Sequence, residues 1–386
     1  MRFPKLIQLT ATLLLIFSFP SVSFSHVVID SSRLYGVTID DISSLNSIVT
    51  SLNNLCRKPT ARIVFDEWQP ATEYTQAVNS IHNVSFIMGE ILDSYYMSQY
   101  SYPQYVDRVN EYFTAFSNNV DLWEVGNEVN GEWLGSIDSV VNKVSTTYDI
   151  VKGSNKKTEM TLYYNYNCWS NPNNEMFHWV LNYLPGRMRT GLDYVLVSYY
   201  EDDCNNYQPN WQRVFDSLHV LFPNSKLGIG ECGTSYTSRK APYITRYYTM
   251  NITTPGYIGG YFWWYYREDC VPYTLSLWSV LNTAIENTPT FVGNSQVPVS
   301  DKIILYNYPN PFNPLTRIHY NIPQASIVSL KVYDITGREV KTLVHEFQQR
   351  GQYDILFDGS DIVSGVYMYK LTSGEKTQVQ KMVLIK

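Results

Sequence analysis

Short apolar runs alternate with longer stretches of mixed apolar and polar residues from residue 34 onward. Runs of β-branched and aromatic residues predict strands, and apolar positions that recur every three or four residues predict helices. The predicted strands are Leu34–Ile42, Ala61–Glu67, Val84–Leu92, Leu122–Glu128, Met160–Asn165, Tyr194–Tyr200, Lys226–Glu231 and Tyr257–Tyr265. The predicted helices between them include Ile42–Leu55, Tyr102–Asn118, Ser136–Lys152, Asn174–Leu184, Trp211–Leu221 and Lys240–Met250.

This alternation predicts the fold class α/β. Eight strands with intervening helices over about 250 residues are the expected count for a (β/α)8 TIM barrel, which we place at residues 26–287. A doubly wound sheet is the alternative, but no glycine-rich phosphate loop follows the first predicted strand.

The pattern changes near the C-terminus. Residues 288–302 are rich in Pro, Gly, Asn and Ser and predict a linker. Residues 303–386 carry short strands separated by turns and no long helical pattern, which predicts a small Ig-like β-sandwich. Its clearest strands are Arg317–Ile322, Ile327–Tyr333, Gln352–Phe357, Gly365–Tyr369 and Gln378–Ile385.

The N-terminus has the pattern of a secretory signal peptide. Arg2 and Lys5 precede the apolar run Leu6–Phe19, and Ser23-x-Ser25 provides small residues for cleavage before His26. Residues 1–25 are therefore expected to direct export. Five cysteines suit an oxidising compartment, and a Cys168–Cys204 disulfide is one pairing that the sequence suggests, with Cys270 expected on the same rim.

Composition narrows the classes of partner. The net charge is −6 and no basic cluster is present, so nucleic acid is not an expected partner. The chain has 33 tyrosines and nine tryptophans, whose flat apolar faces suit the C–H faces of sugar rings.

Two predicted strands end in a carboxylate. One is in DLWEVGNEVNGEW, where an apolar run ends at Asn127 and Glu128, and the other is in KLGIGECG, which ends at Glu231. An ionised carboxylate is costly to bury without a partner, so packing does not explain these positions. Strands four and seven face each other across the mouth of an eight-stranded barrel, where paired carboxylates can cleave glycosidic bonds.

WEVGNE and the strand-seven glutamate resemble clan A glycoside hydrolases over most of residues 30–270. The resemblance implies a retaining mechanism, with Glu128 as the acid/base and Glu231 as the nucleophile. It also implies that Asn127 holds the sugar 2-hydroxyl and that Arg62, in ARIVFDEW, supports the nucleophile.

Further positions follow from the same resemblance. Tyr200 is expected to donate a hydrogen bond to Glu231, although Ser198 stands where the family has a His. Trp264 is expected to form the floor of the sugar subsite, with Trp263 as the competing choice. Apart from the resemblance, Glu67 and Glu90 end predicted strands and Trp133 lies in a predicted rim loop, so all three are expected near the catalytic face as candidates for substrate contact.

The tail resembles a second family. YPNPFNP, VYDITGREVKTL, GVYMYKL and the final KMVLIK are similar to the C-terminal sorting domain of type IX secretion cargo. The resemblance implies that the type IX secretion machinery is a partner. It also implies a secreted or surface-attached protein of a Gram-negative bacterium.

No HExxH, GxSxG or P-loop motif and no paired CxxC motifs occur, so we expect neither a metal nor another cofactor. The sequence therefore predicts a secreted retaining β-glycoside hydrolase that acts on a polysaccharide or oligosaccharide. The alternative is a catalytically silent carbohydrate-binding protein on the same barrel, which the missing His before Tyr200 keeps open.

Overall fold

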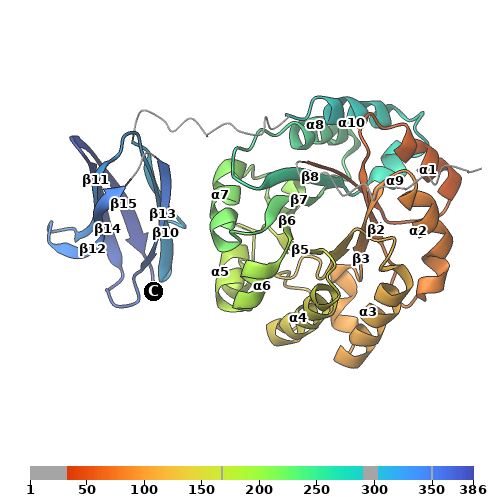
Figure 1. Cartoon of the computed structure of the whole chain (residues 1–386), viewed down its shortest axis with the longest axis horizontal. Helices are drawn as coiled ribbons and strands as arrows, with labels where there is room; N and C mark the ends of the chain where they lie inside the picture. The colour runs from red at the N-terminus through yellow and green to blue at the C-terminus, as the bar shows by residue number, and fades with distance from the viewer. Residues whose placement is uncertain (1–32, 167, 290–302, 349–350) are drawn as a thin grey trace, which may run out of the picture.

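The computed structural model describes residues 33–166, 168–289, 303–348 and 351–386. The predicted signal peptide and nearly all of the predicted linker lie outside the described residues. The described chain forms a barrel and a separate β-sandwich beside it (Figure 1).

Eight parallel strands form a closed barrel in sequence order, and β8 closes it against β1 (Figure 1). The predicted TIM barrel is confirmed. The strands are β1 (Leu34–Ile39), β2 (Thr60–Val64), β3 (Phe86–Glu90), β4 (Leu122–Glu124), β5 (Thr158–Tyr163), β6 (Tyr194–Tyr199), β7 (Lys226–Cys232) and β8 (Tyr257–Trp263).

Helices cover the outside of the barrel and bury their apolar faces on the strands. They are α1 (Leu45–Asn53), α2 (Thr75–His82), α3 (Tyr102–Phe116), α4 (Ile137–Gly153), α5 (Met176–Asn182), α6 (Gly186–Gly191), α7 (Trp211–Leu221), α8 (Thr237–Tyr248), α9 (Tyr266–Cys270) and α10 (Ser276–Glu286). Short 3-10 turns are η1 (Ala71–Tyr74), η2 (Ser94–Gln99), η3 (Pro172–Asn174) and η4 (Glu201–Cys204).

Strand β4 is shorter than the sequence predicts. It ends at Glu124 rather than Glu128, although Val125 N–H still donates to the Glu159 carbonyl at 2.8 Å. The backbone then turns at Glu128, which has a left-handed φ of 45°. The turn is closed by Gly131 N–H, which donates to the Glu128 carbonyl at 2.7 Å. A non-glycine residue held in this conformation often lies at a functional site.

Two buried cations fix the loops at the carboxyl ends of the strands. Arg108 of α3 donates to the carbonyl oxygens of Phe65 and Ile91, each at 2.7 Å. Lys143 of α4 donates to the carbonyl oxygens of Met97 and Tyr100 at 2.7 and 2.6 Å. Because buried carbonyls are satisfied in this way, the loops after β2 and β3 are held in place.

The cysteine predictions are partly confirmed. Cys168 and Cys204 form a disulfide that joins the loops after β5 and β6. Cys270 is buried in α9, which follows β8, and does not take part in that disulfide. Among the described residues, Cys56, Cys232 and Cys270 have free thiols.

The second domain consists of two antiparallel sheets around its own core, which confirms the predicted sandwich. One sheet has the order β13-β10-β9 and the other β12-β11-β14-β15. The strands are β9 (Leu305–Tyr308), β10 (Leu315–Ile322), β11 (Ser326–Asp334), β12 (Glu339–Gln348), β13 (Gly351–Asp358), β14 (Gly365–Ser373) and β15 (Lys376–Leu384). The hydrophobic pattern of the sequence did not predict β9, which has four residues, or the edge strand β12, which is mostly exposed.

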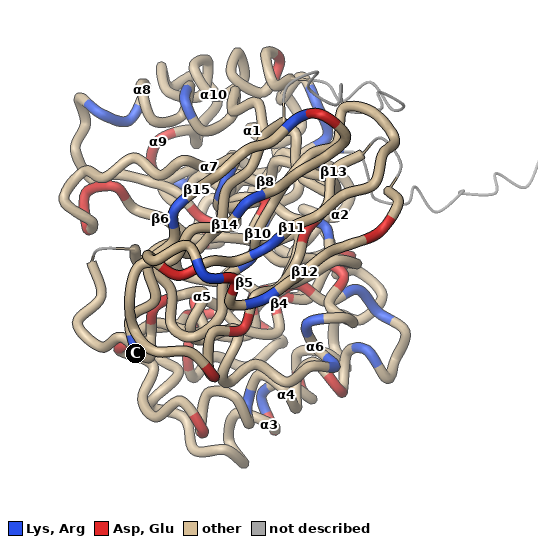
Figure 2. Tube along the Cα trace, turned by 90° about the vertical axis from the view of Figure 1, so that its left-hand side faces the viewer, with Lys and Arg blue, Asp and Glu red and all other residues tan. Residues whose placement is uncertain are grey.

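The sandwich packs against the α5 and α7 side of the barrel (Figure 1). The rings of Phe177 and Tyr308 meet edge to face at 5.2 Å between centroids. Lysines, arginines and acidic residues are interspersed along the described trace of both domains, as Figure 2 shows.

Candidate active site

A cavity of about 530 Å³ opens at the carboxyl ends of the barrel strands. Segments that follow β3, β4, β6 and β8 line it, together with the end of β7 and the residues just after it. This is the face on which TIM barrels carry their active sites. The lining residues are Asp93, Ser94, Tyr95, Asn127, Glu128, Trp133, Tyr200, Asp202, Asp203, Glu231, Thr234, Ser235, Trp264 and Tyr265.

Glu128 is held by two serine hydroxyls. Ser198 Oγ donates to Glu128 Oε1 at 2.6 Å, and Ser94 Oγ donates to Glu128 Oε2 at 2.9 Å. Trp133 Nε1 in turn donates to Ser94 Oγ at 3.0 Å, which orients that hydroxyl. Both carboxylate oxygens of Glu128 are therefore fixed while the group still faces the cavity.

Asn127 is anchored beside Glu128. Its Oδ1 accepts from Ser94 N–H at 2.9 Å, and its Nδ2 donates to Glu124 Oε1 at 3.3 Å. The side chain is 2% exposed and lines the cavity.

Glu231 has a cation and a phenol as its partners. Arg62 Nη1 donates to Glu231 Oε2 at 2.5 Å, and the Tyr200 hydroxyl donates to Oε1 at 2.6 Å. The structure thus contains the hydrogen bond that the sequence assigned to Tyr200. Tyr199 points away and donates to the Tyr207 carbonyl.

Arg62 lies at the centre of a buried carboxylate cluster inside the barrel. Its Nε and Nη2 donate to the two oxygens of Glu124 at 2.8 and 2.9 Å. Glu90 lies 3.1 Å from Nη2, and Thr161 bridges Glu124 and Glu159. One guanidinium thus serves several carboxylates that are almost completely buried.

The two cavity glutamates differ in their electrostatic surroundings. Burial and the charge of Glu231 raise the pKa of Glu128 from 4.5 to about 8, although the two serine hydroxyls oppose the shift. Burial also raises the pKa of Glu231, but there Arg62 and Tyr200 stabilise the charged form. Glu128 has no such cation, so it keeps its proton more readily.

The three tryptophans considered for sugar contact differ in whether they reach the cavity. Trp264 lines the cavity, with its ring centroid 5.7 Å from Arg62 Cζ. Trp263 is fully buried and donates to Asp269 Oδ2 at 3.0 Å, so it has no face toward the cavity. Trp133 is 39% exposed at the cavity wall and meets the ring of Tyr163 edge to face.

Two of the predicted carboxylates lie outside the cavity. Glu90 is 1% exposed and belongs to the Arg62 cluster, so it cannot contact a substrate in this structure. Glu67 is half-buried beside Tyr96, whose pKa it raises, and is not among the lining residues. Both were expected near the catalytic face because they lie at strand ends.

Several residues of the site had no clear sequence signal. Ser94 follows β3 in an unremarkable loop, and Ser198 drew notice only as a replacement for His. Glu124 did carry a signal, because a glutamate inside a predicted buried strand requires a partner. The strand-two arginine Arg62 is that partner.

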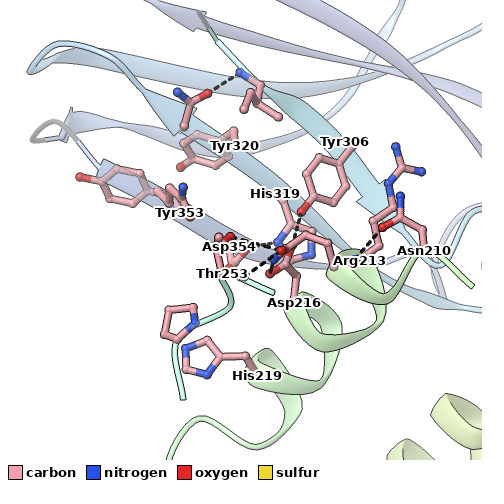
Figure 3. Close-up of a pocket in the computed structure, with 15 residues that line it drawn as sticks. Asn210, Arg213, Asp216, His219, Thr253, Tyr306, His319, Tyr320, Tyr353 and Asp354 are labelled. Atoms are coloured by element: carbon pink, nitrogen blue, oxygen red, sulfur yellow. Dashed lines mark hydrogen bonds and ion pairs between the residues drawn. The ribbon is translucent and has the colours of Figure 1, made fainter. Parts of the chain in front are cut away.

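A second cavity, of about 520 Å³, lies between α7 and the sandwich (Figure 3). Its carboxylates have partners there: the Tyr306 hydroxyl donates to Asp216 Oδ2 at 3.4 Å, and His319 pairs with Asp354. The first contact joins the sandwich to the barrel, and the second joins two strands of the sandwich. Because these carboxylates have structural partners, the cavity at the barrel mouth is the better candidate site.

Within the described residues, no group of three or more His, Cys, Asp or Glu side chains is arranged to hold a metal ion. No described helix combines the length and apolar character needed to cross a membrane.

Residues 307–386 match the family model described as a secretion system C-terminal sorting domain. The chain therefore carries the type IX sorting domain that its tail resembles. The protein is exported by that system to the surface or exterior of a Gram-negative cell. No curated protein sequence matches the chain.

Solved structures show distant likeness. An endo-beta-1,4-mannanase from Thermotoga petrophila has 11% identity and a TM-score of 0.47, covering 92% of this chain and 98% of its own. Saccharomyces cerevisiae Gas2p, solved with laminaritriose and laminaritetraose, has 12% identity and a TM-score of 0.47. The match covers 67% of this chain and 65% of the Gas2p chain. PorZ from Porphyromonas gingivalis has 23% identity and a TM-score of 0.17, and the match covers 24% of this chain and 13% of the PorZ chain.

Proposed function

We propose that this exported protein is a retaining β-glycoside hydrolase that acts on a polysaccharide or oligosaccharide. The observation that carries the proposal is the unequal surroundings of two glutamates in one cavity. Glu231 contacts a buried arginine, whereas Glu128 is bound by two neutral hydroxyls. Such a division provides one ionised and one protonated carboxyl group at the same pH.

In this proposal Glu231 is the nucleophile. Its carboxylate attacks the anomeric carbon, the bond to the leaving oxygen breaks, and a covalent glycosyl-enzyme forms. Arg62 and Tyr200 keep Glu231 charged before the attack, and the fixed hydrogen bonds orient it.

Glu128 is the acid/base. It gives its proton to the leaving glycosidic oxygen and then removes a proton from the water that releases the sugar. When Glu231 is consumed in the covalent intermediate, its negative charge disappears. The pKa of Glu128 then falls, because that charge helps to raise it. The same group can therefore act first as an acid and next as a base.

The remaining cavity residues bind the sugar. Asn127 is placed beside Glu128 to hold the 2-hydroxyl, a contact that strengthens in the transition state. Trp264 and Trp133, which both line the cavity, stack against pyranose rings in this proposal.

A catalytically silent carbohydrate-binding protein is the second candidate. Ser198 favours it, because this residue replaces a family histidine and directly contacts the proposed acid/base. The silent protein would bind glycans in the same cavity without cleaving them.

A panel of aryl β-glycosides and soluble β-glycans tests the proposal with the wild type, Glu128→Ala and Glu231→Ala. We expect wild-type release of sugar, loss of activity in Glu231→Ala, and azide rescue of Glu128→Ala on an activated substrate. The rescued product should be a β-glycosyl azide, because azide needs no base to attack the intermediate.

The panel also identifies the preferred sugar. If both variants match an active wild type, the assignment of Glu128 and Glu231 is wrong. Binding without cleavage across the whole panel would instead establish the silent protein.

A further inference from the structure

The cavity at the barrel mouth is strongly acidic. Five of its lining side chains are carboxylic acids, and none of the described residues that line it is a lysine or arginine. Only two of the five are the proposed catalytic groups. The carboxylic acids are Asp93, Glu128, Asp202, Asp203 and Glu231.

Three of these five groups add little unbalanced negative charge. Glu231 is paired with Arg62 beneath the cavity floor, and Asp202 is paired with Arg239 and Thr234 at its edge. Glu128 has a pKa of about 8 and is uncharged at neutral pH.

Asp93 and Asp203 are the other two carboxyl groups. Neither has an ion pair among the described residues, and burial raises the pKa of each. Asp93 accepts a hydrogen bond from Tyr95 N–H at 2.7 Å, and no ion pair reaches it within the described residues. For Asp203, neither a hydrogen bond nor an ion pair to its carboxylate occurs in the described part of the chain. It adjoins Cys204, whose disulfide to Cys168 fixes the position of this loop.

We infer that this cavity selects uncharged glycans and excludes those bearing carboxylate or sulfate groups, with Asp203 and Asp93 as specificity-determining residues. The inference rests on the proposed function, since it concerns the same cavity. A uronate or sulfate bound there would lose water and meet like charges, and the described lining offers no lysine or arginine to pair with it. A neutral sugar meets the aromatic rings and the hydroxyl and amide groups of the lining, and its binding is not weakened by charge repulsion.

The test compares each neutral soluble β-glycan with the same polymer after partial oxidation of its C6 hydroxyls to carboxylates. For the full chain, both kcat/KM and the dissociation constant are measured at low salt and in 0.5 M NaCl, roughly a tenfold rise in ionic strength. We expect the neutral form to be preferred by about tenfold at low salt, because like charges within a few ångströms repel. High salt should reduce the preference.

Asp203→Asn should raise the ratio of oxidised to neutral affinity by about fivefold at low salt, because one repulsive charge is removed. Asp107→Asn provides the matched control, since it removes the same charge from the exposed face of α3, away from the cavity. It should leave the ratio at the wild-type value.

Equal affinity for neutral and oxidised glycans would overturn the inference, as would an Asp203→Asn ratio equal to that of the control. Failure to bind any neutral glycan would overturn it too. Binding constants separate the proposed selection of uncharged glycans from the proposed hydrolase function. If the protein binds neutral glycans selectively without cleaving them, the selection is supported and the hydrolase function is wrong.

Discussion

At the scale of single residues, Glu128 and Glu231 show how position controls the chemistry of identical side chains. Each is buried at the barrel mouth, and each has both oxygens engaged in hydrogen bonds. The donors differ, because serine hydroxyls are neutral and a guanidinium is charged. That difference favours the proton on Glu128 and the negative charge on Glu231.

The first prediction concerns pH. The proposed acid must be protonated, so kcat/KM should fall as pH rises through the Glu128 pKa of about 8. It should also fall at low pH, as Glu231 gains a proton at a pKa above 4.5. The pH–rate profile should therefore be bell-shaped.

Ser198→Ala tests the source of the alkaline limb. The Ser198 hydroxyl stabilises the charged form of Glu128 and so lowers its pKa. Removing it should move the alkaline limb upward by about one pH unit, equivalent to about 1.4 kcal/mol. Thr342→Ala is a control, because it removes a hydroxyl–carboxylate hydrogen bond in the sandwich. An unshifted limb in Ser198→Ala would show that this contact does not tune the acid.

At the scale of elements, the strands of the barrel position charges as well as packing apolar side chains. Arg62 lies on β2, Glu90 on β3, Glu124 on β4 and Glu231 on β7, yet all four meet inside the barrel. Parallel strands that close into a barrel bring such positions together from distant parts of the sequence. The proposed nucleophile, Glu231, is thus supported by residues from three other strands.

The second prediction concerns the stability of this arrangement. Arg62→Met should lower the free energy of unfolding of the barrel by about 3–5 kcal/mol, because buried carboxylates lose their cation. Urea unfolding followed by tryptophan fluorescence measures the barrel selectively, since all nine tryptophans precede residue 288.

Arg187→Met is the matched control for Arg62→Met. Arg187 pairs with Asp149 on the surface, where both side chains are about half exposed. Its loss should cost less than about 1 kcal/mol. Equal effects of the two substitutions would mean that the buried cluster adds little to stability.

At the scale of the whole molecule, the proposed catalytic site and the sorting domain lie in different domains. Every residue that lines the cavity at the barrel mouth belongs to the barrel. The sorting domain has its own core and meets the barrel at α5 and α7, on the outer helical layer. We therefore expect the proposed catalysis to be separable from export.

The third prediction follows from this division. A chain that lacks residues 303–386 should keep the proposed glycosidase activity of the barrel but accumulate in the periplasm of a host with type IX secretion. Measuring activity in the culture fluid, at the cell surface and in the periplasm for both chains checks this. Equal export of the truncated chain would show that the sorting domain is dispensable.

The sequence by itself determined the barrel, the sandwich and the sorting tail, because these depend on local periodicity and short motifs. The family resemblance helped to set the count of eight strands, and β4 ends earlier than its apolar run predicts. It also indicated Glu128 and Glu231, since a carboxylate that ends an apolar run needs an explanation beyond packing. Only the tertiary structure decided that Ser94 and Ser198 donate hydrogen bonds to Glu128 and that Glu90 pairs with Arg62. It also decided that Glu67 lies outside the cavity. These outcomes depend on the three-dimensional placement of side chains from separate strands and loops, which no local pattern encodes.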